Sequence, residues 1–209
     1  MHRRMNITRA GFLRLGASGV VVAAGSGVLG ARAALAAPPP AKPQGDDVGF
    51  LTFGVVAERT ALSFYRKALM TPGRFDAGER RRLTEARAAK RDHVNKLNAV
   101  LGPDAVGAAD YRVDFPKRAF STRERAVALG IELERLLVGV YVNGAGYSAD
   151  PGTRLLISRL LTVDGQLLGN LRTMIGKPAA DGLPIPLSTD QAGDALDKLI
   201  TVPGSPGGG

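Results

Sequence analysis

The 209-residue chain contains no cysteine and only two histidines. Without cysteine, the protein can form no disulfide, no thiolate metal site, no cysteine nucleophile and no acylated lipoprotein cysteine. His2 lies at the extreme N-terminus, so a Ser-His-Asp arrangement in the folded domain would have to use His93. Its spacing from neighbouring apolar residues places His93 in the middle of a helix, facing the interior, and not in a loop or turn. We therefore do not expect Ser-His-Asp catalysis. The chain also lacks a Gly-rich loop between strand and helix, which leaves nucleotide binding without a mechanism.

The formal net charge of the chain is +9, but most of the chain has no strong excess of basic residues. Residues 1–36 contain five arginines and no acidic residue, whereas the remainder has 23 basic and 19 acidic residues. An excess of four is ordinary for a soluble domain. The basic run at 79–91, ERRRLTEARAAKR, is interleaved with Glu79 and Glu85, as on a solvated helix face. We therefore expect no nucleic-acid partner.

The first 36 residues have the order of an export signal: charged, then apolar, then small. Four arginines between positions 3 and 14 precede a weakly apolar run at 15–30, and Ala34-Leu35-Ala36 supplies a cleavage site. The stretch TRAGFLRLGA resembles the twin-arginine (Tat) motif, but Ala10 stands where the second arginine belongs, so Tat export and general secretion both stay open. The apolar run is shorter than the ~20 residues that a membrane span needs. We expect a periplasmic, cell-envelope or secreted protein without a permanent membrane span.

Helical periodicity without strand alternation dominates the rest of the chain. A Pro-rich linker is expected at 37–47, and a loop, a short helix and a Gly/Pro-rich tail are expected at 177–209. The main helices are expected at roughly 48–70, 76–101, 121–145 and 152–176, with Ser121 or Thr122 as the N-cap of the third. A short helix is expected from about Ser188 to Ile200, with Ser188 as its N-cap. Because the link between helices 2 and 3 is long, the sequence predicts an all-α four-helix bundle over 48–176 with one long crossover.

Polar residues interrupt the apolar seam near the middle of each expected helix. Spacings of three and four residues define the seam that faces the bundle interior. The interrupting residues are Glu58 in helix 1, Lys90 and His93 in helix 2, Glu134 in helix 3, and Asp164 in helix 4. An isolated buried charge costs several kcal/mol even after relaxation, so such a layer must be paired or must bind an ion.

Several stretches in the same order resemble one known family. They are ERTALSFYRKAL at 58–69, DFPKRAF at 114–120, ELERLLVGVYVNGA at 132–145 and LLTVDGQLLGNLR at 160–172. They resemble the ferritin-like superfamily, and specifically the exported bacterial ferritin-like domain family that includes desiccation-related proteins. The resemblance covers nearly all of the expected bundle. It implies a ferritin-like fold and a stress-related or envelope role.

The resemblance also implies where a di-iron site would lie. The family's metal positions fall on Glu58, Lys90, His93, Glu134, Asp164 and Leu167. Complete sites of this type use a Glu from each of two helices and a Glu-x-x-His pair from each of the other two. Here the two pairs have become Lys90-x-x-His93 and Asp164-x-x-Leu167. Three carboxylates and one ammonium leave negative charge for one divalent ion and not for two, which disfavours redox chemistry at paired irons.

Three states of the layer stay open at this point. We favour a metal-free layer without a cofactor, in which Lys90 and His93 pair with the three carboxylates. The second state is a single Fe, Mn or Zn ion bound by surviving ligands among Glu58, His93, Glu134 and Asp164, because three or four N and O ligands suffice for such an ion. The third, least favoured state is a working di-iron oxidase.

These states correspond to different functions. The first predicts a non-catalytic binding or structural protein, and the others predict a metal-binding protein or an iron oxidase or storage protein. Tyr65 and Tyr141 lie on the seams and are expected to be core aromatics and not redox groups. We expect a monomer or dimer, and nothing in the sequence identifies a protein partner.

Overall fold

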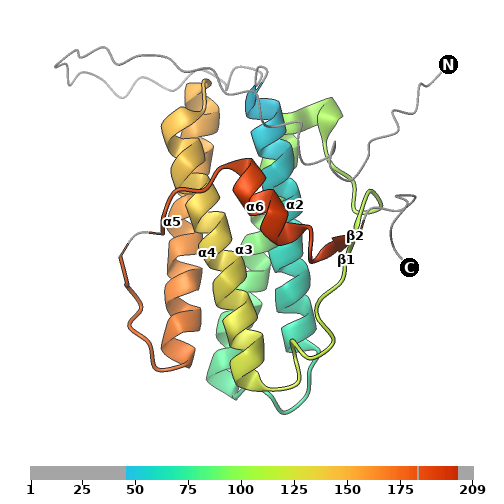
Figure 1. The fold of residues 1–209 in the computed structure, drawn as a ribbon, viewed down its shortest axis with the longest axis vertical. Coiled ribbons are helices and arrows are strands. Elements are labelled where there is room, and N and C mark those ends of the chain that lie inside the picture. Colours follow the sequence, from blue (N-terminus) through green and yellow to red (C-terminus); the bar gives the residue numbers. More distant parts are fainter. Residues whose placement is uncertain (1–45, 183, 202–209) are drawn as a thin grey trace.

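The computed structural model describes residues 46–182 and 184–201 (Figure 1). Four long helices form its main body: α2 (Asp46–Leu69), α3 (Ala77–Leu101), α4 (Arg123–Tyr147) and α5 (Pro151–Met174). The smaller elements are η1 (Gly102–Asp104), β1 (Arg112–Val113), α6 (Thr189–Leu196) and β2 (Ile200–Thr201). The predicted all-α bundle with a long crossover between its second and third helices is confirmed. The expected export signal and the part of the expected linker at 37–45 lie outside the described residues.

Side-chain caps determine where the helices begin. The Asp76 carboxylate accepts from Glu79 N, and the Glu79 side chain accepts from Asp76 N, so a capping box opens α3. Thr122, one of the two expected residues, caps α4. Asp150 caps α5, and Pro151 occupies the first helical position. A backbone N–H at that position has no partner within the helix, so proline loses no hydrogen bond there.

The first helix begins at Asp46, two residues earlier than expected. Asp47 is buried and accepts hydrogen bonds from the backbone N–H groups of Ala149 and Asp150, at 3.1 and 2.9 Å. A negative charge is also favourable in the first turn of a helix. Residues 46–47 therefore belong to the bundle and not to the preceding linker.

The four helices pack as two pairs around one apolar core. α2 lies against α3 and α4 lies against α5, while contacts of α2 with α4 and of α3 with α5 close the bundle. The crossover between α3 and α4 runs along the side of the bundle (Figure 1). Within the described chain, no helix combines the length and apolar character needed to cross a bilayer.

The C-terminal segment completes the core from outside the four helices. α6 lies over α2 and α4 (Figure 1), and β2 pairs antiparallel with β1 in the crossover. Ser188 caps α6 as expected, but the helix ends at Leu196 and not near Ile200, because Ile200 pairs with Val113. The two-residue strands were not expected, since so short a pair has no recognisable alternation.

Candidate functional site

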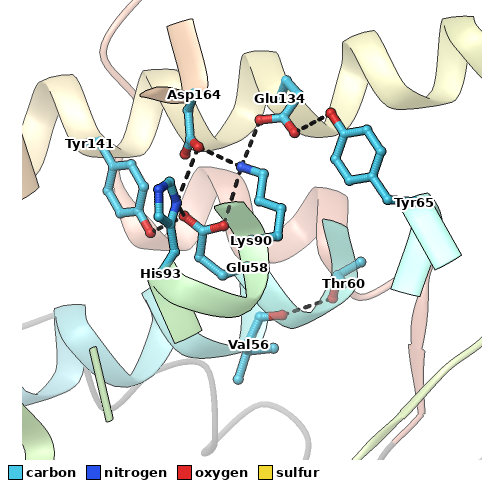
Figure 2. Close-up of polar contacts among 9 residues, drawn as sticks. All are labelled: Val56, Glu58, Thr60, Tyr65, Lys90, His93, Glu134, Tyr141 and Asp164. Carbon is cyan, nitrogen blue, oxygen red and sulfur yellow. Dashed lines mark hydrogen bonds and ion pairs between the residues drawn. The ribbon is translucent and has the colours of Figure 1, made fainter. Parts of the chain in front are cut away.

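Five polar side chains from all four long helices meet at the middle of the bundle (Figure 2). They are Glu58 on α2, Lys90 and His93 on α3, Glu134 on α4, and Asp164 on α5. Each is at most 2% exposed. The three-residue step between Lys90 and His93 places both on one face of α3, about one helical turn apart. The structure therefore brings every polar residue of the seams into one cluster, which we call the charge cluster.

Lys90 lies at the centre of the charge cluster. Its Nζ is 2.6 Å from Asp164 Oδ1, 2.8 Å from Glu134 Oε2 and 3.2 Å from Glu58 Oε2. The contact with Asp164 is an aligned hydrogen bond, whereas the other two oxygens face the ammonium as ion pairs. Burial favours the neutral amine, but the three carboxylates outweigh it and raise the pKa of Lys90 well above its usual value. The side chain is therefore an ammonium at neutral pH.

His93 supplies a second positive charge to the cluster. Its Nδ1 lies 3.0 Å from Glu58 Oε1 and 3.3 Å from Asp164 Oδ1. Burial opposes protonation, but the hydrogen bonds and charges of Asp164 and Glu58 raise the pKa of His93 to about 9. At pH 7 the imidazole is therefore protonated, and Nδ1 donates to the carboxylates.

Two buried tyrosines complete the cluster by reciprocal hydrogen bonds between α2 and α4. Tyr65 on α2 donates to Glu134 Oε1 at 2.7 Å, and Tyr141 on α4 donates to Glu58 Oε1 at 2.8 Å. Burial and the nearby carboxylates raise the pKa of both phenols, so both remain donors at neutral pH. Both tyrosines lie in the core as expected, but their hydrogen bonds to the glutamates were not predicted. The available signal was that each lies seven residues after a seam glutamate.

The three carboxyl groups differ in how strongly they hold a proton. Burial alone would raise the pKa of Glu58, but Lys90, His93 and Tyr141 together lower it to about 2. For Glu134 burial outweighs the attraction of Lys90, and the pKa rises to about 7. Burial and the charge of Glu58 also raise the pKa of Asp164. One proton held on the Glu134 and Asp164 side would leave two negative charges against the two positive charges of Lys90 and His93.

The arrangement does not fit a two-metal centre. Leu167, which the family resemblance aligns with a second imidazole, is buried and offers no ligand atom. Lys90, which the resemblance aligns with a carboxylate ligand, has its ammonium among the three carboxylates of the cluster. A two-metal centre uses four carboxylates to balance two dications. The charge cluster therefore offers too few ligands and too little negative charge for two metal ions.

A smaller set of side chains in the cluster has the geometry to bind a single metal ion. Glu58, His93 and Asp164 each offer one ligand atom, and these atoms lie within 4.8 Å of one another. Two carboxylates and an imidazole suit Zn, Mn or Fe(II). Among the described residues, Asp164 Oδ2 is buried and has no hydrogen-bond partner, so it is free to act as a ligand. Glu134 is outside this set, and one of its oxygens accepts from Tyr65 while the other faces Lys90.

Comparison with known proteins agrees with the architecture. No curated protein and no solved structure matches the chain significantly. The family profile described as ferritin-like domain matches residues 46–177, from the first residue of α2 to just beyond the end of α5. That match covers more than half of the chain and contains the whole charge cluster. The chain therefore belongs to the ferritin-like domain family.

Proposed function

We propose that this protein is an exported, non-catalytic member of the ferritin-like family in which Lys90 takes the place of the internal metal. One observation carries the proposal: Nζ of Lys90 lies within 3.2 Å of a carboxylate from each of the three other long helices. The ammonium thereby does for these carboxylates what a cation does in a metal centre.

Electrostatics make Lys90 and a metal ion competitors for the same place. At an effective dielectric constant near 20, a dication about 4 Å from an ammonium is repelled by roughly 8 kcal/mol. An ion could enter only if the ammonium left the cluster or lost its proton, and the carboxylates raise the pKa of Lys90. The intact charge cluster therefore disfavours both iron oxidation and iron storage.

The role that remains is binding or structural. A buried network of paired charges penalises any packing in which one of its members loses its partners, so the charge cluster would fix the register of the four helices. The signal-like order of residues 1–36 supports action outside the cytoplasm, and the family resemblance supports a stress-related or envelope process.

Metal analysis of the purified protein tests this proposal. The protein is incubated with Fe(II), Zn(II) or Mn(II), desalted, and its metal content is measured by plasma mass spectrometry. We expect far less than one ion per chain. The Asn95→Ala variant, which changes an exposed residue on the same helix, is the control for handling.

The second candidate is a metal-binding protein or iron oxidase that uses the three-ligand set of Glu58, His93 and Asp164. It predicts one ion per chain in the wild-type protein and in Asn95→Ala, and loss of that ion in His93→Ala. That result would overturn the metal-free proposal. Oxygen consumption after addition of Fe(II) would then separate an oxidase from a protein that only holds the ion.

A further inference from the structure

Four helix termini meet at one end of the bundle, and contacts between them define a continuous surface there. α2 and α5 end at this surface, and α3 and α4 begin at it, at the lower end of Figure 1. Arg80 Nη2 donates to Leu69 O at 3.0 Å, which ties α3 to α2. Arg123 binds both the Glu79 carboxylate and Met174 O, which ties α4 to α3 and α5. We call this surface the basic end and assign to it residues 66–82, 114–125 and 172–181.

Exposed basic side chains outnumber acidic ones at the basic end by nine to four. The basic residues are Arg66, Lys67, Arg74, Arg81, Arg82, Lys117, Arg118, Arg125 and Lys177. The exposed acidic residues already have other partners: Asp76 caps α3, and Asp114, Glu124 and Asp181 pair with Arg112, Arg123 and Arg172. None of those three arginines is among the nine, so the positive charge of the surface is not cancelled by its own acids.

The opposite end of the bundle has the reverse charge. Residues 47–50, 98–110 and 145–155 contain four aspartates, of which Asp47 is buried, and one basic residue, Arg154. Hydrogen bonds from Ala149 and Asp150 to Asp47 hold the start of α2 against the turn between α4 and α5. The charge of the molecule is therefore separated along the bundle axis. Such a charge distribution turns the basic end toward an anionic surface during approach.

A large apolar side chain is exposed on this positive surface, in the turn between α2 and α3. Met70 follows the last turn of α2, where Arg66 and Lys67 lie, and is 74% exposed. Arg74 follows it in the turn to α3. Basic residues around an exposed apolar side chain are the combination that binds the interface of an anionic bilayer, because the charges pair with headgroups and the apolar group enters the acyl boundary.

We propose that the basic end docks the protein onto an anionic phospholipid surface, with Met70 at the level of the headgroups. A nucleic-acid partner fits this surface less well than a lipid surface does. Proteins bind single-stranded nucleic acid by stacking its bases on exposed aromatic side chains. Among the described residues the large exposed aromatic side chain, Tyr147, lies at the opposite end of the bundle. This surface is separate from the charge cluster, so the inference stands independently of metal content.

Vesicle co-sedimentation of the full chain tests the proposal with two variants of equal charge. The test variant combines Arg74→Gln, Arg81→Gln and Lys117→Gln. The control combines Arg91→Gln, Arg159→Gln and Lys198→Gln, which are exposed and lie outside the basic end. Because both variants keep the arginines of residues 1–36, any binding by that segment is common to them. The vesicles are phosphatidylcholine alone, or phosphatidylcholine with about a third phosphatidylglycerol.

The wild-type protein should bind the phosphatidylglycerol vesicles at low salt and release them as salt increases. Each basic residue near the surface contributes about fivefold to partitioning, so the test variant should bind roughly a hundredfold more weakly than wild type. The control should stay within severalfold of wild type. Met70→Ser, which leaves the charge unchanged, should weaken binding severalfold by removing the apolar anchor.

Other results would overturn the proposal. Equal binding by the two triple variants, no binding to phosphatidylglycerol vesicles at low salt, or equal binding to neutral vesicles would each do so. Displacement of the protein from vesicles by equimolar duplex DNA would point to a nucleic-acid partner instead. Salt-sensitive self-association without vesicles, lost in the test variant, would identify the acidic end of a second copy as the partner.

Discussion

Lys90 is a fully buried cation whose charge is shared by carboxylates from three helices. Lys90→Met keeps most of the side-chain volume but leaves three carboxyl groups facing one another with His93 as the remaining cation. Removing one partner of a buried ionic cluster typically costs about 3–5 kcal/mol of unfolding free energy. Urea denaturation should show a loss of that size, against almost none for the exposed control Arg91→Met. A loss under about 1 kcal/mol would contradict the role assigned to Lys90.

The converse substitution tests whether Lys90 excludes the metal. Lys90→Glu restores the Glu-x-x-His pair on α3 and replaces the ammonium with a fourth carboxylate, so the cluster then requires cations. We expect this variant to be less stable than wild type without metal, and to gain both bound Zn(II) or Mn(II) and a higher Tm when the ion is added. The double variant with His93→Ala should lose the ion. If Lys90→Glu took up no ion, the charge of Lys90 would not be what keeps metal out.

The charge cluster should also make stability depend on pH through His93. Its pKa is raised from 6.5 to about 9, so the stabilisation is fully present below pH 6.5 and is lost as the pH rises through 9. The loss is about 3 kcal/mol at most. Urea denaturation at pH 6.5 and at pH 9 should show the difference, and His93→Gln should reduce it. An equal pH dependence in His93→Gln would place its origin in another group.

At the scale of elements, close packing of α4 depends on glycine. A Cβ on Gly130 would lie 2.6 Å from Cζ of Phe64 and 3.0 Å from Cδ1 of Leu171. The Phe64 ring packs against the rings of Tyr65 and Phe120, which limits its movement. Gly130→Ala should therefore destabilise the fold by about 1–3 kcal/mol through overpacking.

Gly165 on α5 is the matched control for this substitution. A Cβ there would meet nothing within 4 Å, so Gly165→Ala should stabilise the protein by about 0.5–1 kcal/mol through helix propensity alone. Thermal unfolding of both variants would show opposite shifts in Tm. Shifts of the same sign would mean that α2 and α4 do not approach each other as closely as the structure shows.

The long helices and the residues of the charge cluster were predictable because each follows from local rules. Three- and four-residue spacing is a property of the helix itself, and it predicted the burial of Glu58, Lys90 and Asp164 on their seams. Ser188 was identifiable as a cap, and Ser121 and Thr122 as the two candidates for α4, because Ser and Thr side chains bond to backbone groups three residues ahead.

Features that depend on contacts between distant elements were not predictable in this way. The pairing of β1 with β2 joins two-residue segments far apart in the chain. The bonds of Tyr65 and Tyr141 to glutamates on the opposite helix require knowing that α2 and α4 face each other. Whether Lys90 points at the carboxylates is likewise a matter of side-chain geometry, which spacing alone does not determine.

At the scale of the whole molecule, the folded unit extends beyond the family match at 46–177. Ala192 and Leu196 of α6, and Leu199 and Ile200 after it, belong to the buried core. The segment before α6 crosses α4 at Gly139, where Leu187 N donates to Gly139 O at 3.0 Å. A Cβ on Gly139 would lie 2.9 Å from Ile185 O, so the absence of a side chain allows this close crossing. The C-terminal segment is therefore part of the bundle's packing.

Removing that segment should test how far the cooperative unit extends. A chain ending at Lys177 loses three large buried side chains, Leu196, Leu199 and Ile200, each worth about 1.5–3 kcal/mol. The sum is comparable to the whole stability of a typical domain, so this chain should unfold without a cooperative urea transition. A chain ending at Thr201 keeps every contact of α6 and β2 described above and should unfold like the full protein. If the chain ending at Lys177 instead unfolded with the midpoint of the full chain, the four helices would be self-sufficient and α6 would be an accessory to the bundle.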